Sequence, residues 1–402
     1  MKRPIRVLVI ARNYPNPALP TLGIWTSRLV HASRTSADPV VVAPVPWAPP
    51  GFPEEPFGRY RAVPASRDDD GVPVYHPRFP LAPGYLLHSF EGAFVYPSVR
   101  RVAERLHRER PFDLIHAHFI YPDGVVAARL GARLGVPVMT TEPAPWVPWL
   151  NDHPRVRRQV ARALPHISLV TAVSESQRRQ LAPFTGAITP TEVLPNIVDD
   201  DVFVLGDEVH DPDQLAFVGV VRRVKGLDVL VRALALLRPQ HPALRLVVVG
   251  NPYYRAYRRD EEEVRRLVGE LGLQDRVRFA GQASPAEVAT AMRTSALLVM
   301  PSRRETFGAV AIEALASGTP VVTTRCGGPE DTMTDDVANF APPEDPPALA
   351  RAIEDGLRAR LARDPKRLRE FAVSRYGRRV VGERIAELYE GILRPAPVGS
   401  HA

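Results

Sequence analysis

The chain has 402 residues, 45% hydrophobic and 24% charged, an ordinary globular composition with material for two or three domains. One cysteine, Cys326, excludes a disulfide framework and a cysteine-based zinc site and fits a reducing compartment. No apolar run approaches the ~20 residues of a membrane-spanning helix, and the N-terminus resembles a first strand more than a signal peptide, so we expect a cytoplasmic protein. The formal net charge of +7 fits either a solvated surface or affinity for phosphates, and the dispersed arginines disfavour nucleic acid as a partner.

Short apolar runs alternate with amphipathic stretches along the whole chain. Uninterrupted Val/Ile/Leu runs are typical of strands buried on both faces of a parallel sheet, and alternation with helices indicates βαβ units. The pattern therefore predicts an α/β protein with doubly wound sheets. The expected strands are 5–10, 39–44, 113–118, 136–141, 168–173, 214–219, 244–250, 276–281, 296–300 and 319–324, with helices such as 123–135, 227–240 and 261–272.

Ten strands are too many for one comfortable sheet, and segment 195–214 is rich in Pro and Asp and lacks periodicity. We therefore expect two Rossmann-like domains facing each other across a cleft, 1–203 and 204–374, followed by a last helix at 375–393. The Pro-rich segment 44–85 predicts a surface excursion, with an acceptor-binding or membrane-facing loop as the alternative.

Ligands of open α/β sheets bind beyond the carboxyl ends of the strands, so the loops that follow strands are the expected place for a binding site. Gly23 precedes a helix, where backbone amides can approach a phosphate, although a lone glycine is a weak signal. His118 ends strand 113–118, which favours a site role over the commoner structural one. We expect His116 and His118 to point to opposite faces of that strand.

After strand 214–219, three cations precede a helix: Arg222, Arg223 and Lys225. Cations beside a helix N-terminus suit a diphosphate, and a basic solvated turn is the alternative. The cluster DDD at 199–201 lies in the expected linker and DDD at 68–70 in an expected loop, so no Asp-x-Asp metal motif is expected at a strand end.

The stretch PSRRETFGAVAIEALASGTPVV, residues 301–322, predicts a helix that starts near Gly308 and ends before Gly318. Glu313 shares a small-residue face of this helix, where a sugar ring could approach closely. Glu305 could bind a second polyol, and the amides of residues 306 to 308 are free to hold a phosphate between the two. The alternative is a pair of solvated glutamates.

At this point the chain resembles a family 4 retaining glycosyltransferase of the GT-B fold. The resemblance covers nearly the whole chain, and the Glu-x7-Glu block with the following GTPVV is its most specific part. Six blocks carry it: RNYP…LGIW, DLIHAHFIYPDGVVAARLGARLGVPV, VTAVSES…TEVLPNIVDDDVF, VGVVRRVKGLDVLVRAL, LVVVGN…LGLQDRVRFAGQAS, and PSRRETFGAVAIEALASGTPVVTTRCGGPEDTM.

The resemblance implies a nucleotide-diphospho-sugar donor held mainly by the C-terminal domain. It implies that Glu313 holds the ribose hydroxyls and Glu305 the donor sugar. Lys225 and the amides of Phe307 and Gly308 would hold the diphosphate.

The same resemblance implies that His118 lies near the transferred sugar and that Gly23 allows the first loop to approach the phosphates. It also implies that the last helix crosses back to the N-terminal domain. In a retaining transfer the leaving diphosphate itself is the expected base. Because no Asp-x-Asp motif is expected at a strand end, neither a metal nor another cofactor is expected.

Three departures from the family pattern matter. Val220 stands where the family usually has arginine, which leaves Arg222 or Arg223 to supply the guanidinium. Thr306 replaces a common glycine and could narrow the donor pocket. The family's His-Gly after strand 136–141 is replaced by TTEPAPWVPW, so the expected acceptor-side residues are Glu142, Trp146 and Trp149.

We expect an active hexosyltransferase that uses a UDP- or GDP-sugar and a carbohydrate, lipid-linked or small-molecule acceptor, in polysaccharide, glycolipid or small-molecule glycoside biosynthesis. We expect it to be a monomer or homodimer. The alternatives are an epimerase or phosphorylase of the same fold, and a catalytically weak nucleotide-sugar-binding subunit of a polysaccharide assembly complex. Segments 96–110 and 154–166 are arginine-rich, which indicates solvated helices or, alternatively, peripheral contact with anionic lipid.

Overall fold

The computed structural model describes residues 3–51, 58–80, 88–144, 150, 152–186, 188–250 and 258–394. The chain forms two compact units, the first made of 1–196 with 379–402 and the second of 197–378. The division thus falls a few residues before the expected one, and the chain returns to the first unit within its last helix.

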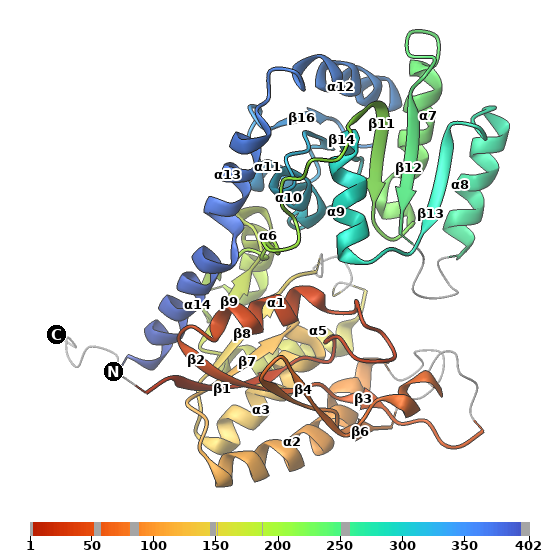
Figure 1. Ribbon diagram of the computed structural model, residues 1–402. Helices are drawn as coiled ribbons and strands as arrows, with labels where there is room; N and C mark the ends of the chain where they lie inside the picture. The colour runs from red at the N-terminus through yellow and green to blue at the C-terminus, as the bar shows by residue number, and fades with distance from the viewer. Residues whose placement is uncertain are drawn as a thin grey trace. The chain divides into compact units, whose positions relative to one another are not determined.

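The first unit is built on an eight-stranded sheet in the order β10-β9-β8-β7-β1-β2-β5-β4 (Figure 1). Its pairings are parallel except for the β4–β5 hairpin. The strands are β1 (Ile5–Ile10), β2 (Ala37–Val42), β4 (Ser66–Asp69), β5 (Val72–Tyr75), β7 (Leu114–His118), β8 (Val138–Glu142), β9 (Leu169–Ala172) and β10 (Thr191–Val193), with β3 (Val45–Pro46) and β6 (Arg78–Phe79) forming a separate pair.

The hairpin and β10 are not among the expected strands, and two residues of the DDD at 68–70 lie in β4 instead of a loop. Strand β4 lies at the edge of the sheet and its residues are polar. It was not predicted because an edge strand lacks the apolar run by which buried strands are recognised.

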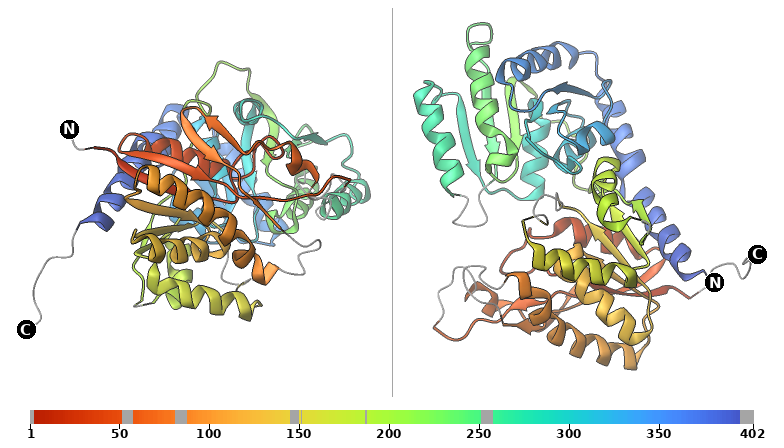
Figure 2. Two further views of the ribbon diagram at one scale, coloured as in Figure 1. Left: turned by 90° about the horizontal axis from the view of Figure 1, so that it is seen from below. Right: turned by 180° about the vertical axis from the view of Figure 1, so that it is seen from behind.

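Helices cover both faces of this sheet (Figures 1 and 2). The last helix, α14, belongs to the first unit: its Tyr389 hydroxyl lies 2.8 Å from Nδ1 of His116, and a Cβ on Gly382 would come within 2.9 Å of the Ala32 carbonyl oxygen. The helices are α1 (Ile24–Ser33), α2 (Glu91–Glu109), α3 (Val125–Leu134), α5 (Pro154–Ala163), α6 (Glu175–Thr185) and α14 (Arg378–Leu393), with short turns η1 (Gly58–Ala62), η3 (His88–Phe90), η4 (Ile120–Gly124) and η5 (Leu164–His166).

The second unit has a six-stranded parallel sheet in the order β13-β12-β11-β14-β15-β16. Its strands are β11 (Asp211–Val218), β12 (Arg245–Val249), β13 (Val277–Gly281), β14 (Ser295–Met300), β15 (Val321–Thr324) and β16 (Ala338–Ala341). Helices α7, α8 and α12 share one hydrophobic core with the sheet, while α10 contacts α9 and α13. The helices are α7 (Leu227–Leu237), α8 (Arg258–Glu270), α9 (Pro285–Arg293), α10 (Ala309–Ala316), α11 (Gly328–Thr332), α12 (Pro346–Ala359) and α13 (Pro365–Tyr376), with the 3₁₀ turn η6 (Arg223–Lys225).

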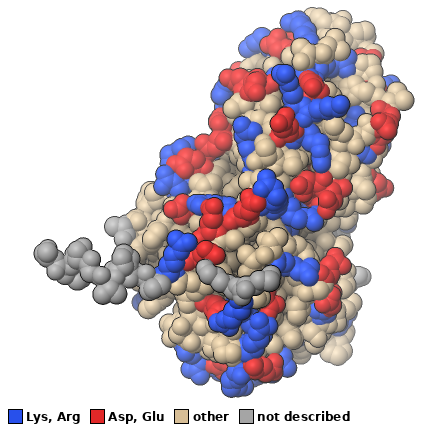
Figure 3. Space-filling model, turned by 60° about the vertical axis from the view of Figure 1, so that its left-hand side comes forward, with Lys and Arg blue, Asp and Glu red and all other residues tan. Residues whose placement is uncertain are grey.

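Charged side chains of both signs are interspersed over the face in Figure 3. Within the described residues, no helix is both long and apolar enough to cross a membrane.

Candidate functional site

Gly226 fixes the turn that carries Lys225, which follows the carboxyl end of β11. Gly226 has φ 69°, and a Cβ there would lie 1.9 Å from the carbonyl oxygen of Pro301, so only glycine fits. The amide of Arg303 also donates to the carbonyl oxygen of Val224, at 2.8 Å. The Lys225 turn is thereby held directly against the segment that follows β14.

This packing brings Lys225 and Glu305 together. Lys225 Nζ lies 2.6 Å from Glu305 Oε2, and the two side chains are 31% and 15% exposed. The Glu305 backbone is held as well, since its carbonyl oxygen accepts from the amide of Gly328 at 2.8 Å. The result is a partly exposed cation beside a fixed carboxylate, which can offer one partner to a phosphate and another to a hydroxyl group.

The segment after Glu305 leads into the N-terminus of α10. Gly308 has φ 88° and carries no side chain that could cap the first turn. Phe307 is buried with its ring against Tyr376, and Thr306 is also buried. Gly328 approaches so closely that a Cβ there would lie 2.3 Å from the carbonyl carbon of Thr306. This segment therefore has a fixed backbone at the positive end of a helix dipole.

Glu313 lies within α10 and is only 5% exposed. A carboxylate this buried is expected to have polar partners or to face a polar ligand. Ala309, four residues before it, and Ala316, three residues after it, are small, as the sequence pattern required for a close approach.

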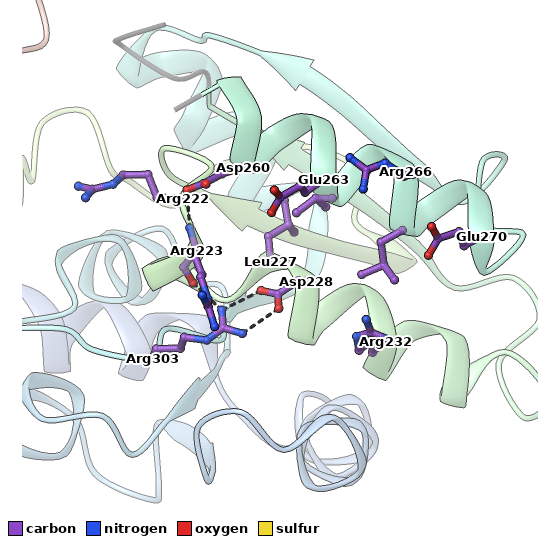
Figure 4. Close-up of a pocket in the computed structure, with 12 residues that line it drawn as sticks. Arg222, Arg223, Leu227, Asp228, Arg232, Asp260, Glu263, Arg266, Glu270 and Arg303 are labelled. Atoms are coloured by element: carbon purple, nitrogen blue, oxygen red, sulfur yellow. Dashed lines mark hydrogen bonds and ion pairs between the residues drawn. The ribbon is translucent and has the colours of Figure 1, made fainter. Parts of the chain in front are cut away.

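Arg222 and Arg223 line a pocket that does not include Lys225. The pocket has a volume of about 380 Å³ and lies between α7 and α8, and neither Glu305 nor Glu313 is among its lining residues (Figure 4). The backbone amide of Arg223 donates to Asp260 Oδ2 at 2.9 Å. The replacement of the missing family guanidinium by one of these arginines thus stays a prediction.

Arg303 also lines this pocket and is held by carboxylates. Its guanidinium donates to both oxygens of Asp228, at 2.8 and 2.7 Å (Figure 4). It also donates to Glu344 at 2.9 Å. Hydrogen bonding to Asp228, opposed by burial and aided by Glu344, raises the pKa of Arg303. Arg303 therefore braces the Lys225 turn and was not recognised from the sequence.

In the first unit, His118 ends β7 and is buried beside His116. Their rings stack with centroids 4.4 Å apart, so the expectation of opposite faces was wrong. Side chains alternate with a period of two along a strand, and residues i and i+2 therefore share a face. Burial lowers the pKa of His116 to about 3; burial and the neighbouring His116 hold the pKa of His118 well below its usual value. Both rings are neutral at pH 7.

The Nε2 atom of His118 is buried and has no hydrogen-bond partner within the part of the chain that is described. His116, in contrast, uses both ring nitrogens, since Nε2 lies 2.8 Å from Thr141 Oγ1 and Nδ1 contacts Tyr389. His118 is therefore the member of the pair that has hydrogen-bonding capacity left for a ligand.

Glu142 ends the neighbouring strand β8 and is completely buried. Its oxygens accept from the backbone amides of Ile120 at 2.9 Å and Ala144 at 3.0 Å. Burial, with a contribution from Asp123, raises its pKa to about 7. These contacts brace the strand ends. Trp146 and Trp149, the other expected acceptor-side residues, lie outside the described residues.

Gly23 directly precedes α1 with φ 71°. A Cβ at this position would lie 2.0 Å from the carbonyl oxygen of Asn13, so the loop between β1 and α1 folds back onto itself there.

A set of buried ionisable side chains near the end of β1, which includes Asp123 and Glu91, was not recognised from the sequence. Asp123 Oδ2 accepts from the amide of Arg12 at 2.8 Å, and the Arg12 guanidinium forms an ion pair with buried Glu91. His88 Nδ1 lies 2.9 Å from the other oxygen of Glu91. Asp123 follows strand β7 in the sequence PDG, which was the available signal. Among the described residues, no group of three or more His, Cys, Asp or Glu side chains is arranged to hold a metal ion.

Two family models match this chain. The model described as Glycosyltransferase Family 4 matches residues 38–202, and the one described as Glycosyl transferases group 1 matches residues 205–375. Similar curated proteins include two D-inositol 3-phosphate glycosyltransferases. The protein from Actinosynnema mirum is 33% identical over 65% of this chain and 69% of its own length. The protein from Acidothermus cellulolyticus is 30% identical over 65% of this chain and 64% of its own length, slightly less than two thirds.

Solved structures with the same fold include a sucrose-phosphate synthase from Thermosynechococcus elongatus, with a TM-score of 0.77 and 21% identity over 96% of this chain and 99% of that one. Anabaena HepE in complex with UDP has a TM-score of 0.74 and 18% identity over 96% of this chain and 100% of that one. At these identities the likeness concerns the fold alone, and it confirms the expected GT-B class.

Proposed function

Because the chain belongs to glycosyltransferase family 4, we propose that it transfers a hexosyl unit from a nucleotide-diphospho-sugar to a hydroxyl acceptor with retention of configuration. The observation that carries this proposal is the Lys225–Glu305 pair, 2.6 Å apart, beside the N-terminus of α10. A cation, a fixed carboxylate and the backbone amides at a helix N-terminus are the partners that a phosphate joined to a polyol requires.

In this proposal each end of the donor has its own residue in the second unit. Glu305 accepts from hydroxyls of the sugar, Lys225 and the amides of Phe307 and Gly308 hold the diphosphate, and Glu313 accepts from the ribose hydroxyls. Gly308 has a φ of 88°, a backbone conformation that favours glycine. A backbone fixed in this way holds the amides of Phe307 and Gly308 in place, and preorganised donors stabilise charge without rearranging during the reaction.

The transfer then proceeds on one face of the sugar. The bond between the anomeric carbon and the diphosphate oxygen breaks, the acceptor oxygen bonds to the same carbon, and the acceptor proton passes to the departing diphosphate. Lys225 and the helix amides stabilise the charge on that diphosphate. Neutral His118, with its free ring nitrogen, would hydrogen-bond the transferred sugar. We propose that no metal ion takes part.

The acceptor class is a carbohydrate, a lipid-linked glycan or a small polyol. D-inositol 3-phosphate should be among the first acceptors tested, because several similar curated proteins are named for it.

Peripheral contact with anionic lipid is a separate proposal. The only charged residues in α5 are arginines, and vesicle flotation with and without anionic lipid tests whether the protein binds such a surface.

A thermal-shift screen of UDP-, GDP-, ADP- and TDP-sugars tests the donor proposal. A true donor raises the melting temperature, since a ligand that binds only the folded state stabilises it. The matching nucleotide should then be released faster when an acceptor is added, with and without EDTA, and the product's anomeric configuration is read by NMR. Stabilisation by no nucleotide-sugar would overturn the proposal, and binding without any transfer would favour the catalytically weak subunit.

A further inference from the structure

Asp69, the last residue of β4, is a meeting point for side chains from separate segments of the first unit. Tyr14 donates its hydroxyl to Oδ2 at 2.8 Å, and Arg67 Nη1 donates to Oδ1 at 2.8 Å. His31 Nε2, on α1, lies 3.4 Å from Oδ2. Burial raises the pKa of Asp69, but the hydrogen bonds from Tyr14 and Arg67 outweigh it, and the net pKa lies below its usual value. Asp69 is therefore an ionised, partly buried acceptor.

The loop between β1 and α1 is held by this group at two consecutive residues. Tyr14 is fully buried and reaches Asp69 with its side chain, while the carbonyl oxygen of Pro15 accepts from Arg67 Nη2 at 2.8 Å. Because Arg67 bonds both to Asp69 and to Pro15, it links the loop backbone to the same carboxylate.

Gly23 is coupled to these residues through the fold of the loop. A Cβ on Gly23 would meet the carbonyl oxygen of Asn13 at 2.0 Å and the amide nitrogen of Tyr14 at 2.9 Å. The backbone that Asp69 holds is thus the backbone against which Gly23 is packed.

We propose that Asp69 is a positioning residue that fixes the loop 11–23, and Gly23 with it, through Tyr14 and Arg67. This inference rests on the proposed function and on the family resemblance, which implies that the loop at Gly23 approaches the donor phosphates. A loop that is already ordered loses less entropy when the donor binds and holds the reactants in better alignment. Asp69 acts through its partners and touches no substrate.

Asp69→Asn tests this inference because it keeps the size of the side chain and removes its charge. Asp70→Asn is the matched control: Asp70 is the next residue, exposed, with φ 48°, a conformation that asparagine tolerates. Amide hydrogen exchange of residues 11–24 in the unliganded protein should become about tenfold faster in D69N and stay unchanged in D70N. Unchanged exchange in D69N, or an equal increase in D70N, would overturn the proposal.

Tyr14→Phe removes the same contact from the side of the loop and serves if D69N folds poorly. If Asp69 acts through Tyr14, the double variant should exchange little faster than the faster single variant. Fully multiplicative effects on exchange would show that the two residues act independently and would contradict the proposal.

Kinetic measurements distinguish the positioning role of Asp69 from the proposed glycosyltransferase function. With a donor identified, D69N should raise the donor KM about five- to tenfold and lower kcat less, while D70N matches the wild type. A wild-type protein without any donor turnover overturns the proposed function, whereas the exchange measurement still decides whether Asp69 fixes the loop.

Discussion

Lys225 Nζ lies 2.6 Å from Glu305 Oε2, although the residues are 80 positions apart in the chain. In the unliganded protein the cation proposed to hold the diphosphate is therefore already paired with the carboxylate proposed to hold the sugar. A bound donor would add its phosphate to this pair or displace the carboxylate toward the sugar hydroxyls. Lys225 and Glu305 would then influence each other's contacts with the donor, as they already pair in the free protein.

Lys225→Ala should lower kcat at least about a hundredfold, because it removes a charge that stabilises the leaving diphosphate. The melting temperature should change little, since a partly exposed ion pair contributes about 1 kcal/mol or less. Nucleotide release at saturating donor is the measurement. Lys366→Ala, at an exposed lysine of α13, is the control and should keep wild-type activity. Full activity in the Lys225 variant would exclude the phosphate role.

Glu313→Gln tests the ribose contact. A hydrogen bond to a charged acceptor is worth about 1.5–3 kcal/mol, so the donor KM should rise about tenfold or more. The informative comparison uses nucleotide-sugars that lack one ribose hydroxyl: the wild type should discriminate against them, and the variant should discriminate less. Glu370→Gln, at an exposed glutamate of α13, is the control. An undiminished preference for the intact ribose in the Glu313 variant would place the ribose elsewhere.

The buried strands could be predicted closely from the sequence. The expected strand 5–10 coincides with β1, and the expected 244–250 contains β12 (Arg245–Val249), because a continuous apolar run is a local signal. In contrast, β16 (Ala338–Ala341) has only four residues, and its strand conformation depends on pairing with β15. Such an edge strand is specified by its neighbours.

Candidate residues constrained by local backbone geometry were also visible in the sequence. Gly226 and Gly308 both adopt positive φ next to residues proposed to bind the donor. Contacts between distant segments could not be inferred, and Asp69 with Tyr14 is the clearest example, since 55 positions separate them. The environment of Asp123 was missed for the same reason, because burial is decided by tertiary packing.

Gly308→Ala should destabilise the protein and weaken donor binding together. Its φ of 88° is unfavourable for alanine, and the new Cβ would lie 3.2 Å from Met300 Cε. Left-handed conformation alone costs about 1–2 kcal/mol of unfolding free energy. Denaturant unfolding and donor titration are the measurements. Gly391→Ala, in α14 with no atom within 4 Å of its Cβ, should instead be neutral or stabilising by up to about 1 kcal/mol. Equal stability of the two variants would contradict the strain at Gly308.

Asp123→Asn should alter the pH dependence of stability. Burial raises the pKa of Asp123 to about 7, partly offset by Arg12, whereas in the unfolded chain this carboxyl titrates near pH 4, as aspartate usually does. Between these values the folded chain retains a proton that the unfolded chain has lost. The contribution of Asp123 to stability is therefore full below about pH 4 and falls as pH rises to about 7.

Asparagine does not titrate, so the stability of the variant relative to the wild type should rise between pH 5 and pH 7 and level off above about pH 7.5. For one proton the rise is at most about 1.4 kcal/mol per pH unit. Denaturant unfolding of both proteins at intervals across this range measures it. The buried histidines with lowered pKa values, such as His116 and His118, occur in both proteins and largely cancel in the difference. Asp70→Asn should run parallel to the wild type. A parallel curve for the Asp123 variant would show that Asp123 titrates as an ordinary carboxyl.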